Sequence, residues 1–322
     1  MTDTTQAPFV LRDGLNLALY DWPLPMRWRP RGVVLIVHGL GEHAWRYDTL
    51  AQRLNERGFA VRAYDQRGHG DSAGLHGAIP YEDALLDDLH ELVEDTRHHI
   101  ATPWSCPLIL LGHSMGGLVS SAYVQRQLGA AHRPVDALVL SSPALDPGLS
   151  WLQSRLLSLM LRLAPDLALG NGLDASKISH SAEVVQAYQR DRLVHDRITA
   201  RLAHFIQSRG VRVRASAPQW NLPTLLLYAG DDRLFLPVEN IELLTPNDQV
   251  KFVICSREDY DWANSKLIQY GLERRAGEVL FSPSHKQVDA RALADWYTPD
   301  GLLKLLAQDL PTAEQVLKAE PH

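Results

Sequence analysis

Pro107-Leu108-Ile109-Leu110-Leu111-Gly112-His113-Ser114-Met115-Gly116-Gly117 is the stretch that decides the fold. Its four consecutive apolar residues predict a short strand that is buried on both faces of a parallel sheet. The residues that follow, from Leu118 to Val124, are typical of a helix. A G-x-S-x-G sequence between a strand and a helix predicts a nucleophile elbow, a sharp turn that lifts the serine hydroxyl clear of the sheet.

The residue types around Ser114 suit such a turn. Gly112 and Gly116 keep side-chain bulk away on both sides of the serine. At the N-terminus of the following helix, backbone N–H groups and the helix dipole can stabilise an oxyanion. The alternative is a chance occurrence, because the five-residue pattern alone is common. The strand before it and the helix after it favour the elbow, so Ser114 is the candidate nucleophile.

Composition bounds the class of protein. The chain has 322 residues, of which 45% are hydrophobic and 22% charged, enough for one large α/β domain or two small ones. The net charge is −6 and no Lys/Arg run occurs, which argues against a nucleic-acid partner. Two cysteines, Cys106 and Cys255, provide neither a disulfide framework nor a C-x-x-C metal pattern. No signal-peptide pattern and no apolar run of about 18 residues is seen, so we expect a cytoplasmic protein without a membrane span.

Strand and helix patterns alternate along most of the chain. Parallel strands joined by helical crossovers produce a sheet that is covered by helices on both faces. The sequence therefore predicts an α/β fold with a mostly parallel sheet. The expected elements are a hairpin over 9–22, strands at 33–37, 59–64, 108–111 and 135–140, a return of the strand pattern over 223–234, and helices at 45–57 and 81–100.

The alternation stops at Pro147, and residues 148–215 look helical. The segment Trp151–Leu163 is almost wholly apolar, with Arg155, Ser158 and Arg162 on one narrow stripe. Two compatible interpretations follow: a helix packed over the domain, and a cap that shapes an acyl-binding cavity and contacts lipid surfaces. We expect a core of residues 1–146 and 216–240, a helical cap of 147–215, and an atypical C-terminal segment, 241–322, that completes the core.

Several motifs in order now suggest a family. They are 37–43 (Val-His-Gly-Leu-Gly-Glu-His), 64–70 (Tyr-Asp-Gln-Arg-Gly-His-Gly), 112–117 and 230–234 (Gly-Asp-Asp-Arg-Leu). With the cap stretches 171–174 and 193–195, they resemble the α/β-hydrolase superfamily, and within it the monoacylglycerol lipase and lysophospholipase-like group. The resemblance covers about residues 9–240.

The resemblance implies roles for particular residues. Ser114 would be the nucleophile, and the backbone N–H groups of Leu40 and Met115 would form the oxyanion hole. Asp232 would be the acid that orients the catalytic histidine, with the adjacent Asp231 as the alternative. His38 and His43 would brace the oxyanion loop. The 65–72 turn would be scaffold, with Arg67 and His69 bonding backbone groups. The group needs no cofactor or metal.

The sequence departs from the family pattern at the histidine that would act as the general base. In this fold the triad histidine follows the acid in the chain. Only His285 and His322 lie beyond Asp232, and the family's aromatic-flanked histidine signature is missing. If residues 278–281 form the last strand, His285 lies on the loop beyond it and is the candidate base. Its rival interpretation is a lone polar residue on a surface loop, and His322 lies at the chain end, where fraying is common.

Residues 243–296 resemble something unrelated. The segments 244–254, 259–263 and 280–285 are similar to the C-terminal part of 7-carboxy-7-deazaguanine synthase, a radical S-adenosylmethionine enzyme. That chemistry needs a cysteine triplet to hold an iron–sulfur cluster. With two cysteines and no C-x-x-x-C-x-x-C, this chain cannot carry it.

The sequence thus predicts a serine hydrolase that cleaves carboxylic esters of single-chain lipids through an acyl-enzyme, with a small lipid or ester as its partner. A peptidase or thioesterase stays open within the superfamily. An epoxide hydrolase or dehalogenase is disfavoured, because those need an aspartate at the elbow. The alternative of another class is a hydrolase scaffold with impaired or no catalysis, since the usual histidine loop is replaced and a serine without a base is a poor nucleophile.

Overall fold

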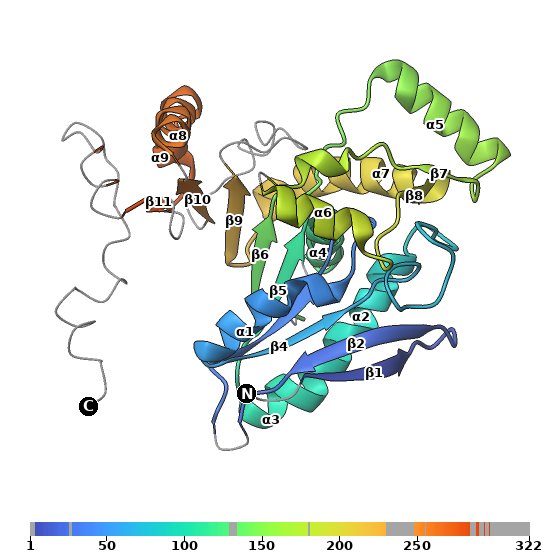
Figure 1. Cartoon of the computed structure of the whole chain (residues 1–322), viewed down its shortest axis with the longest axis horizontal. Helices are drawn as coiled ribbons and strands as arrows, with labels where there is room; N and C mark the ends of the chain where they lie inside the picture. The colour runs from blue at the N-terminus through green and yellow to red at the C-terminus, as the bar shows by residue number, and fades with distance from the viewer. Residues whose placement is uncertain are drawn as a thin grey trace. The chain divides into compact units, whose positions relative to one another are not determined.

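The computed structural model of the protein describes residues 4–25, 28–128, 134–179, 181–229, 248–254 and 256–283, with positions 288, 289, 293 and 296. These residues fall into two compact units (Figure 1). The first runs to Thr224, and the second begins at Leu225.

The sheet of the first unit places the predicted elbow strand beside the first buried strand. Its strand order is β1-β2-β4-β3-β5-β6. Strands β4, β3, β5 and β6 are parallel, and the hairpin β1-β2 joins them antiparallel through β2. This mostly parallel sheet confirms the predicted fold class. The bounds are β1 Thr5–Val10, β2 Asn16–Trp22, β3 Gly32–Val37, β4 Phe59–Tyr64, β5 Leu108–His113 and β6 Ala137–Ser141.

Helices cover both faces of this sheet, as the alternating pattern predicted. Helix α1 (Asp48–Glu56), preceded by the 3₁₀ turn η1 (Ala44–Tyr47), packs on one face. Helices α2 (Ala84–Thr96) and α4 (Met115–Arg126) contact each other on the other face (Figure 1). Helix α2 continues as a π-helical turn, η2 (Arg97–Ala101), and the short α3 (Thr102–Trp104).

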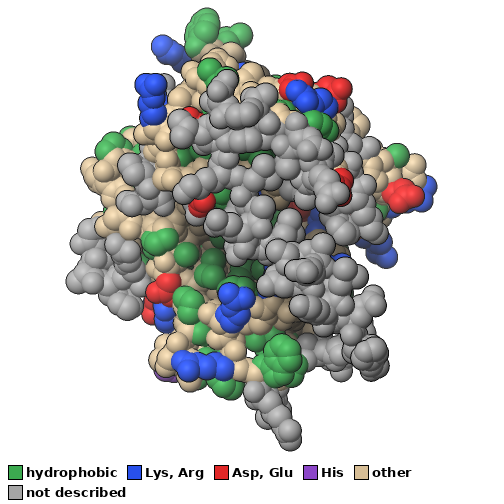
Figure 2. Space-filling model, turned by 90° about the vertical axis from the view of Figure 1, so that its left-hand side faces the viewer, with side chains coloured by type: hydrophobic (Ala, Val, Ile, Leu, Met, Phe, Trp, Pro, Cys, Tyr) green, Lys and Arg blue, Asp and Glu red, His purple; other side chains and the backbone are tan. Residues whose placement is uncertain are grey.

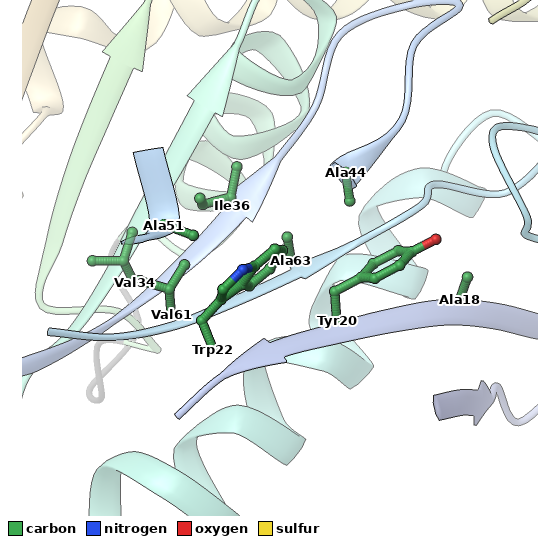
Figure 3. Packing of buried hydrophobic residues seen from close by; sticks show 9 residues of the cluster. All are labelled: Ala18, Tyr20, Trp22, Val34, Ile36, Ala44, Ala51, Val61 and Ala63. Carbon is green, nitrogen blue, oxygen red and sulfur yellow. The ribbon is translucent and has the colours of Figure 1, made fainter. Parts of the chain in front are cut away.

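The core beneath α1 shows why the hairpin belongs to the sheet. Trp22 and Tyr20 extend from β2 toward Val61 and Ala63 of β4 (Figure 3). Trp22 is 2% exposed, and its indole Nε1–H donates to the Asp48 carboxylate at the start of α1 over 2.8 Å. Burial of such a large ring contributes about 2–3 kcal/mol. The Asn55 side-chain amide of α1 also donates to the Trp22 carbonyl at 3.0 Å, so apolar packing and these two hydrogen bonds fix the hairpin against α1.

One expectation about the 65–72 turn is wrong. Arg67 does not bond backbone groups; its buried guanidinium contacts the carboxylates of Asp88 in α2, at 2.6 and 2.8 Å, and of Asp13 in the hairpin, at 2.8 Å. A buried cation needs a charged partner to offset its lost hydration, and carbonyl groups alone do not supply one. His69 does bond a backbone group, the Arg67 carbonyl, at 3.0 Å.

Residues 147–215 hold mostly helices. These are α5 (Trp151–Leu163), η3 (Ala175–Lys177), α6 (Ala182–Arg190) and α7 (Ala200–Ser216), followed by η4 (Ala217–Gln219). A short antiparallel pair that the sequence did not reveal, β7 (Ala168–Gly170) and β8 (Arg197–Thr199), joins the segment after α5 to the segment before α7. Helix α7 contacts α4, and α5 contacts α7. Figure 1 shows α5 lying away from the sheet.

The second unit contains β9 (Thr224–Ala229), β10 (Asp248–Ile254), α8 (Arg257–Tyr270), α9 (Leu272–Arg275) and β11 (Glu278–Pro283). Strands β10 and β11 are parallel neighbours. The Phe252 and Phe281 rings pack 5.2 Å apart between these strands. Both predicted candidates for a late strand, 249–254 and 278–281, are therefore strands, and they lie side by side.

On the face drawn in Figure 2, Lys and Arg side chains lie scattered between hydrophobic and other residues and form no continuous patch among the described atoms.

Candidate active site

Ser114 occupies the strained turn that the sequence predicts. It directly follows β5 and precedes α4, with φ 51° and ψ −119°. A positive φ at a residue with a side chain costs about 1–3 kcal/mol and persists only where the surrounding structure enforces it. The Ser114 N–H donates to the Ser141 carbonyl at 3.0 Å, and its carbonyl accepts from Ala144 N–H at 3.0 Å. Strand β6 and the loop after it thus hold the elbow in place.

The glycines around Ser114 are required by contact with the backbone. A Cβ at Gly112 would lie 2.4 Å from the Gly116 carbonyl oxygen. A Cβ at Gly116 would lie 2.0 Å from the Val37 carbonyl oxygen at the end of β3. Real side chains do not approach so closely, so the elbow packs backbone against backbone.

The loop after β3 lies against Ser114. Strands β3 and β5 are parallel neighbours, with Val37 opposite Gly112, so their C-terminal ends meet at one edge of the sheet. A Cβ built at Gly39 would be 3.3 Å from the Ser114 Cβ. Leu40, the next residue, is half-buried, and Met115 begins α4, where N–H groups of the first turn have no partner inside the helix. The structure therefore brings Ser114, Met115 and the Leu40 loop together.

A buried carboxylate organises this loop from within. Glu42 Oε1 accepts the Gly39 N–H at 2.6 Å and the Tyr47 hydroxyl at 2.7 Å. Burial raises the pKa of Glu42, but the His113 and His38 imidazoles and these two hydrogen bonds outweigh burial, so the net pKa lies below its usual value. Glu42 therefore stays ionised at neutral pH and fixes Gly39 beside Ser114.

His38 has a structural role, as predicted. Its Nε2 accepts the backbone N–H of Gln66 at 2.8 Å, which leaves the proton on Nδ1, and Nδ1–H donates to the Gly39 carbonyl at 2.8 Å. Burial lowers the pKa of His38. Both ring nitrogens are occupied and the ring is neutral, so His38 braces the loop and is not placed to serve as a base.

Helix α6 and the residue that follows it contact the same region of the chain after β3. His43 Nε2 lies 2.8 Å from Asp191 Oδ2, just past the end of α6. The Arg46 guanidinium lies over the Tyr188 ring of α6, 4.7 Å from its centroid. Sequence analysis did not assign Asp191 or Tyr188 to the site. Their partners are far away in the chain, 148 positions in the His43–Asp191 pair, and no spacing rule connects them.

Four residues weighed for the triad, Asp231, Asp232, His285 and His322, lie outside the described residues. Their roles stay predictions. Among the residues that the structure describes, no group of three or more His, Cys, Asp and Glu side chains is arranged to hold a metal ion. None of the helices in that part of the chain is both long and apolar enough to cross a bilayer.

The fold and the elbow define an α/β hydrolase. Residues 28–251 match the family described as serine aminopeptidase, S33, and the chain belongs to this family. The match includes the loop after β3, the elbow at Ser114 and residues 147–215, and it ends before β11.

Known proteins with similar sequences point to the same group. A monoacylglycerol lipase of Mycolicibacterium smegmatis is 37% identical over 222 residues, which cover 67% of this chain and 75% of that protein. An uncharacterised abhydrolase domain-containing protein of Dictyostelium discoideum is 32% identical over 227 residues, and the chain spans only 23% of its length. The crystal structure of Paleococcus ferrophilus monoacylglycerol lipase superposes with a TM-score of 0.64 at 27% identity, covering 80% of this chain and 99% of that one.

Proposed function

We propose that the protein is a serine hydrolase that cleaves carboxylic esters of single-chain lipids, such as monoacylglycerols or lysophospholipids, through an acyl-enzyme on Ser114. The observation that carries the proposal is the strained Ser114 turn packed against the Gly39–Leu40 loop. In the proposed reaction Ser114 is the nucleophile, and the backbone N–H groups of Leu40 and Met115 are the two donors for the oxyanion. The names of the Mycolicibacterium and Paleococcus relatives support the lipid ester as substrate.

The chemistry follows from the proposed roles. Ser114 Oγ attacks the ester carbonyl while His285 takes its proton, and Asp232 holds the imidazole in the required tautomer. The backbone N–H groups of Leu40 and Met115 stabilise the oxyanion, an effect worth about 10²–10³ in turnover for one donor. The alcohol leaves with the proton from His285. Water, activated by the same histidine, then releases the fatty acid and restores Ser114.

Helix α5 supports a lipid surface as the place where substrate is taken up. Its N-terminus is closed by a capping box between Ser150 and Gln153. The helix nevertheless exposes most of its apolar side chains, a distribution expected of a helix that lies in a membrane interface. The exposed residues are Trp151 at 75%, Leu152 at 63%, Leu156 at 56%, Leu159 at 51% and Leu163 at 75%.

The test compares hydrolysis of short- and medium-chain p-nitrophenyl esters by the intact protein, Ser114→Ala and His285→Ala. We expect both substitutions to reduce turnover by about 10⁶-fold, the loss measured for a serine protease without its nucleophile or base. An aminoacyl p-nitroanilide serves as a control for peptidase activity, which the family description makes the natural rival. Activity of the intact protein at the Ser114→Ala level would contradict the proposal.

A second candidate is a hydrolase scaffold with impaired catalysis. It is favoured by one observation: the family match ends at residue 251, before β11 and the predicted base His285. The resemblance of residues 243–296 to the tail of 7-carboxy-7-deazaguanine synthase agrees with a C-terminal segment of separate origin. Activity of the intact protein at the Ser114→Ala level would support this second candidate. Full activity of His285→Ala together with an inactive Ser114→Ala would contradict it and would show that a group other than His285 acts as the base.

A further inference from the structure

His195 is a buried histidine that the proposed reaction does not use. It lies in the cap just before β8 and is only 8% exposed. Its Nδ1 accepts the backbone N–H of Arg197 at 3.1 Å, and its Nε2 lies 3.1 Å from the Gly68 carbonyl oxygen. A backbone N–H can only donate and a carbonyl can only accept. These two partners therefore fix a neutral ring with its proton on Nε2.

Other histidines enclose this ring. His76 stacks on it with 4.7 Å between centroids and 7° between planes, and His69 packs at 4.6 Å. His69 in turn lies 5.3 Å from His38, the residue that starts the oxyanion loop. His69 and His76 both belong to the loop after β4. The stack thus joins the cap to the scaffold beneath the candidate oxyanion hole.

The backbone of His195 contacts that loop directly. Its N–H donates to the Gly41 carbonyl at 2.9 Å. A Cβ at Gly41, where φ is +74°, would lie 2.3 Å from the His195 carbonyl oxygen. Gly41 follows Leu40, the predicted oxyanion donor. Cap and loop therefore meet backbone to backbone, so a displacement of His195 displaces the residue next to the donor.

We propose that His195 is a positioning residue for the proposed ester hydrolysis: its neutral, stacked imidazole anchors the cap on the Gly68 carbonyl, so that its backbone N–H holds Gly41 and thereby the Leu40 amide in place. The inference rests on the proposed function for its effect on turnover. The anchoring of the loop stands on the contacts alone, and it is measured separately.

Protonation disrupts this arrangement. A proton on Nδ1 faces the Arg197 N–H and removes the acceptor. Burial and the neighbouring His76 lower the pKa of His195 from 6.5 to about 4; His38 also lowers it, while the Gly68 carbonyl and Asp196 raise it. A released His195 binds a proton near pH 6.5, so anchoring is complete above that pH and weakens as pH falls toward 4.

The test uses His195→Ala, His195→Asn and His195→Gln, with His99→Gln as the control because His99 is largely exposed. Turnover and KM are measured on a short p-nitrophenyl ester, and amide hydrogen exchange is measured for the 38–47 segment. We expect Ala and Asn to reduce kcat by about 10- to 100-fold with KM within twofold, as small misplacements do. Both should speed exchange of this segment. Gln, whose amide reaches the Gly68 carbonyl, should recover most of the loss.

The pH dependence of amide exchange in the 38–47 segment gives a second readout. Substitution of a residue that only fills space would not alter this pH dependence. Exchange of the 38–47 segment, corrected for intrinsic rates, should rise in the wild type as pH falls from 6.5 toward 4, and should rise much less in His195→Gln, which does not titrate. Wild-type exchange and kcat in His195→Ala would overturn the inference, and so would a rise in KM alone. If the wild type does not hydrolyse esters, the proposed function is wrong. The comparison of amide exchange between the wild type and the His195 variants still tests whether His195 anchors the 38–47 segment.

Discussion

The Ser114 turn with the end of β3 and the loop after it, here called the elbow wall, belongs to the same compact unit as helix α5. The two regions differ in how their side chains and backbone are packed. Around Ser114, backbone touches backbone, Leu110 is fully buried, and glycines fill positions where no Cβ fits. In α5, Leu157 is the only buried side chain of the helix, at 9% exposed, and large apolar groups face outward. The difference teaches that the first region is defined by its contacts within the chain, whereas the second lacks a covering partner among the described residues.

Among substitutions that test this contrast, Gly116→Ala in the elbow wall should have the largest combined effect on stability and kcat. Gly116→Ala places a methyl group 2.0 Å from the Val37 carbonyl oxygen, so β3 and α4 must separate. Overpacking of this kind lowers the free energy of unfolding by about 1–3 kcal/mol. It also displaces the Met115 amide, so we expect kcat to fall by about 100-fold. Thermal unfolding and ester hydrolysis measure the two effects.

Gly170→Ala is the matched control, because nothing lies within 4 Å of its added Cβ. It should leave both quantities at the wild-type value. Equal effects of the two substitutions would contradict the contrast between the regions.

An intermediate effect on kcat is expected at Glu42, whose negative charge holds the Gly39 N–H in the loop beside Ser114. Glu42→Gln keeps an acceptor for the Gly39 N–H but removes the negative charge, and hydrogen bonds to charged groups contribute about 1.5–3 kcal/mol. We expect a fall in kcat of about tenfold, since a factor of ten corresponds to about 1.4 kcal/mol. Tyr47→Phe removes only the hydroxyl bond to Glu42 and should have a smaller effect. A larger loss from Tyr47→Phe would show that the Gly39 contact is not the important one.

The smallest effect on stability is expected in α5. The double substitution Leu156→Ser with Leu159→Ser alters exposed side chains, so the free energy of unfolding should change by less than about 0.5 kcal/mol per site. Hydrolysis of monoacylglycerol in vesicles should fall several-fold while a short soluble ester is cleaved as before. Leu157→Ser, one position away but buried, should instead destabilise the protein by about 2 kcal/mol or more. Unchanged hydrolysis of monoacylglycerol in vesicles by the double variant would contradict the proposed contact of α5 with the lipid surface.

Local sequence was enough to predict the fold class and the sharp turn at Ser114. The strand before Gly112, the helix after Ser114 and the glycines between them are written in consecutive residues, and the structure follows them. Arg67 was misassigned, because its partner Asp88 is reached only once α2 packs on the sheet. The contact of His195 with Gly68 spans 127 positions and depends on the path of the cap, which periodicity does not describe.

The order of strands in the sheet has a consequence for how the chain is made. Strand β3 lies between β4 and β5, and Val33 of β3 pairs with Leu108 of β5, so its second neighbour is synthesised long after it. The loop that follows β3 is held by His195, which emerges later still. On the ribosome, this apolar edge of β3 therefore stays unpaired until residues 38–113 have been synthesised. Contacts so distant in sequence fold slowly, and an open strand edge is the natural target of a chaperone. The turn at Ser114 and the loop beside it thus gain these contacts only after Ser141 and His195 have been synthesised.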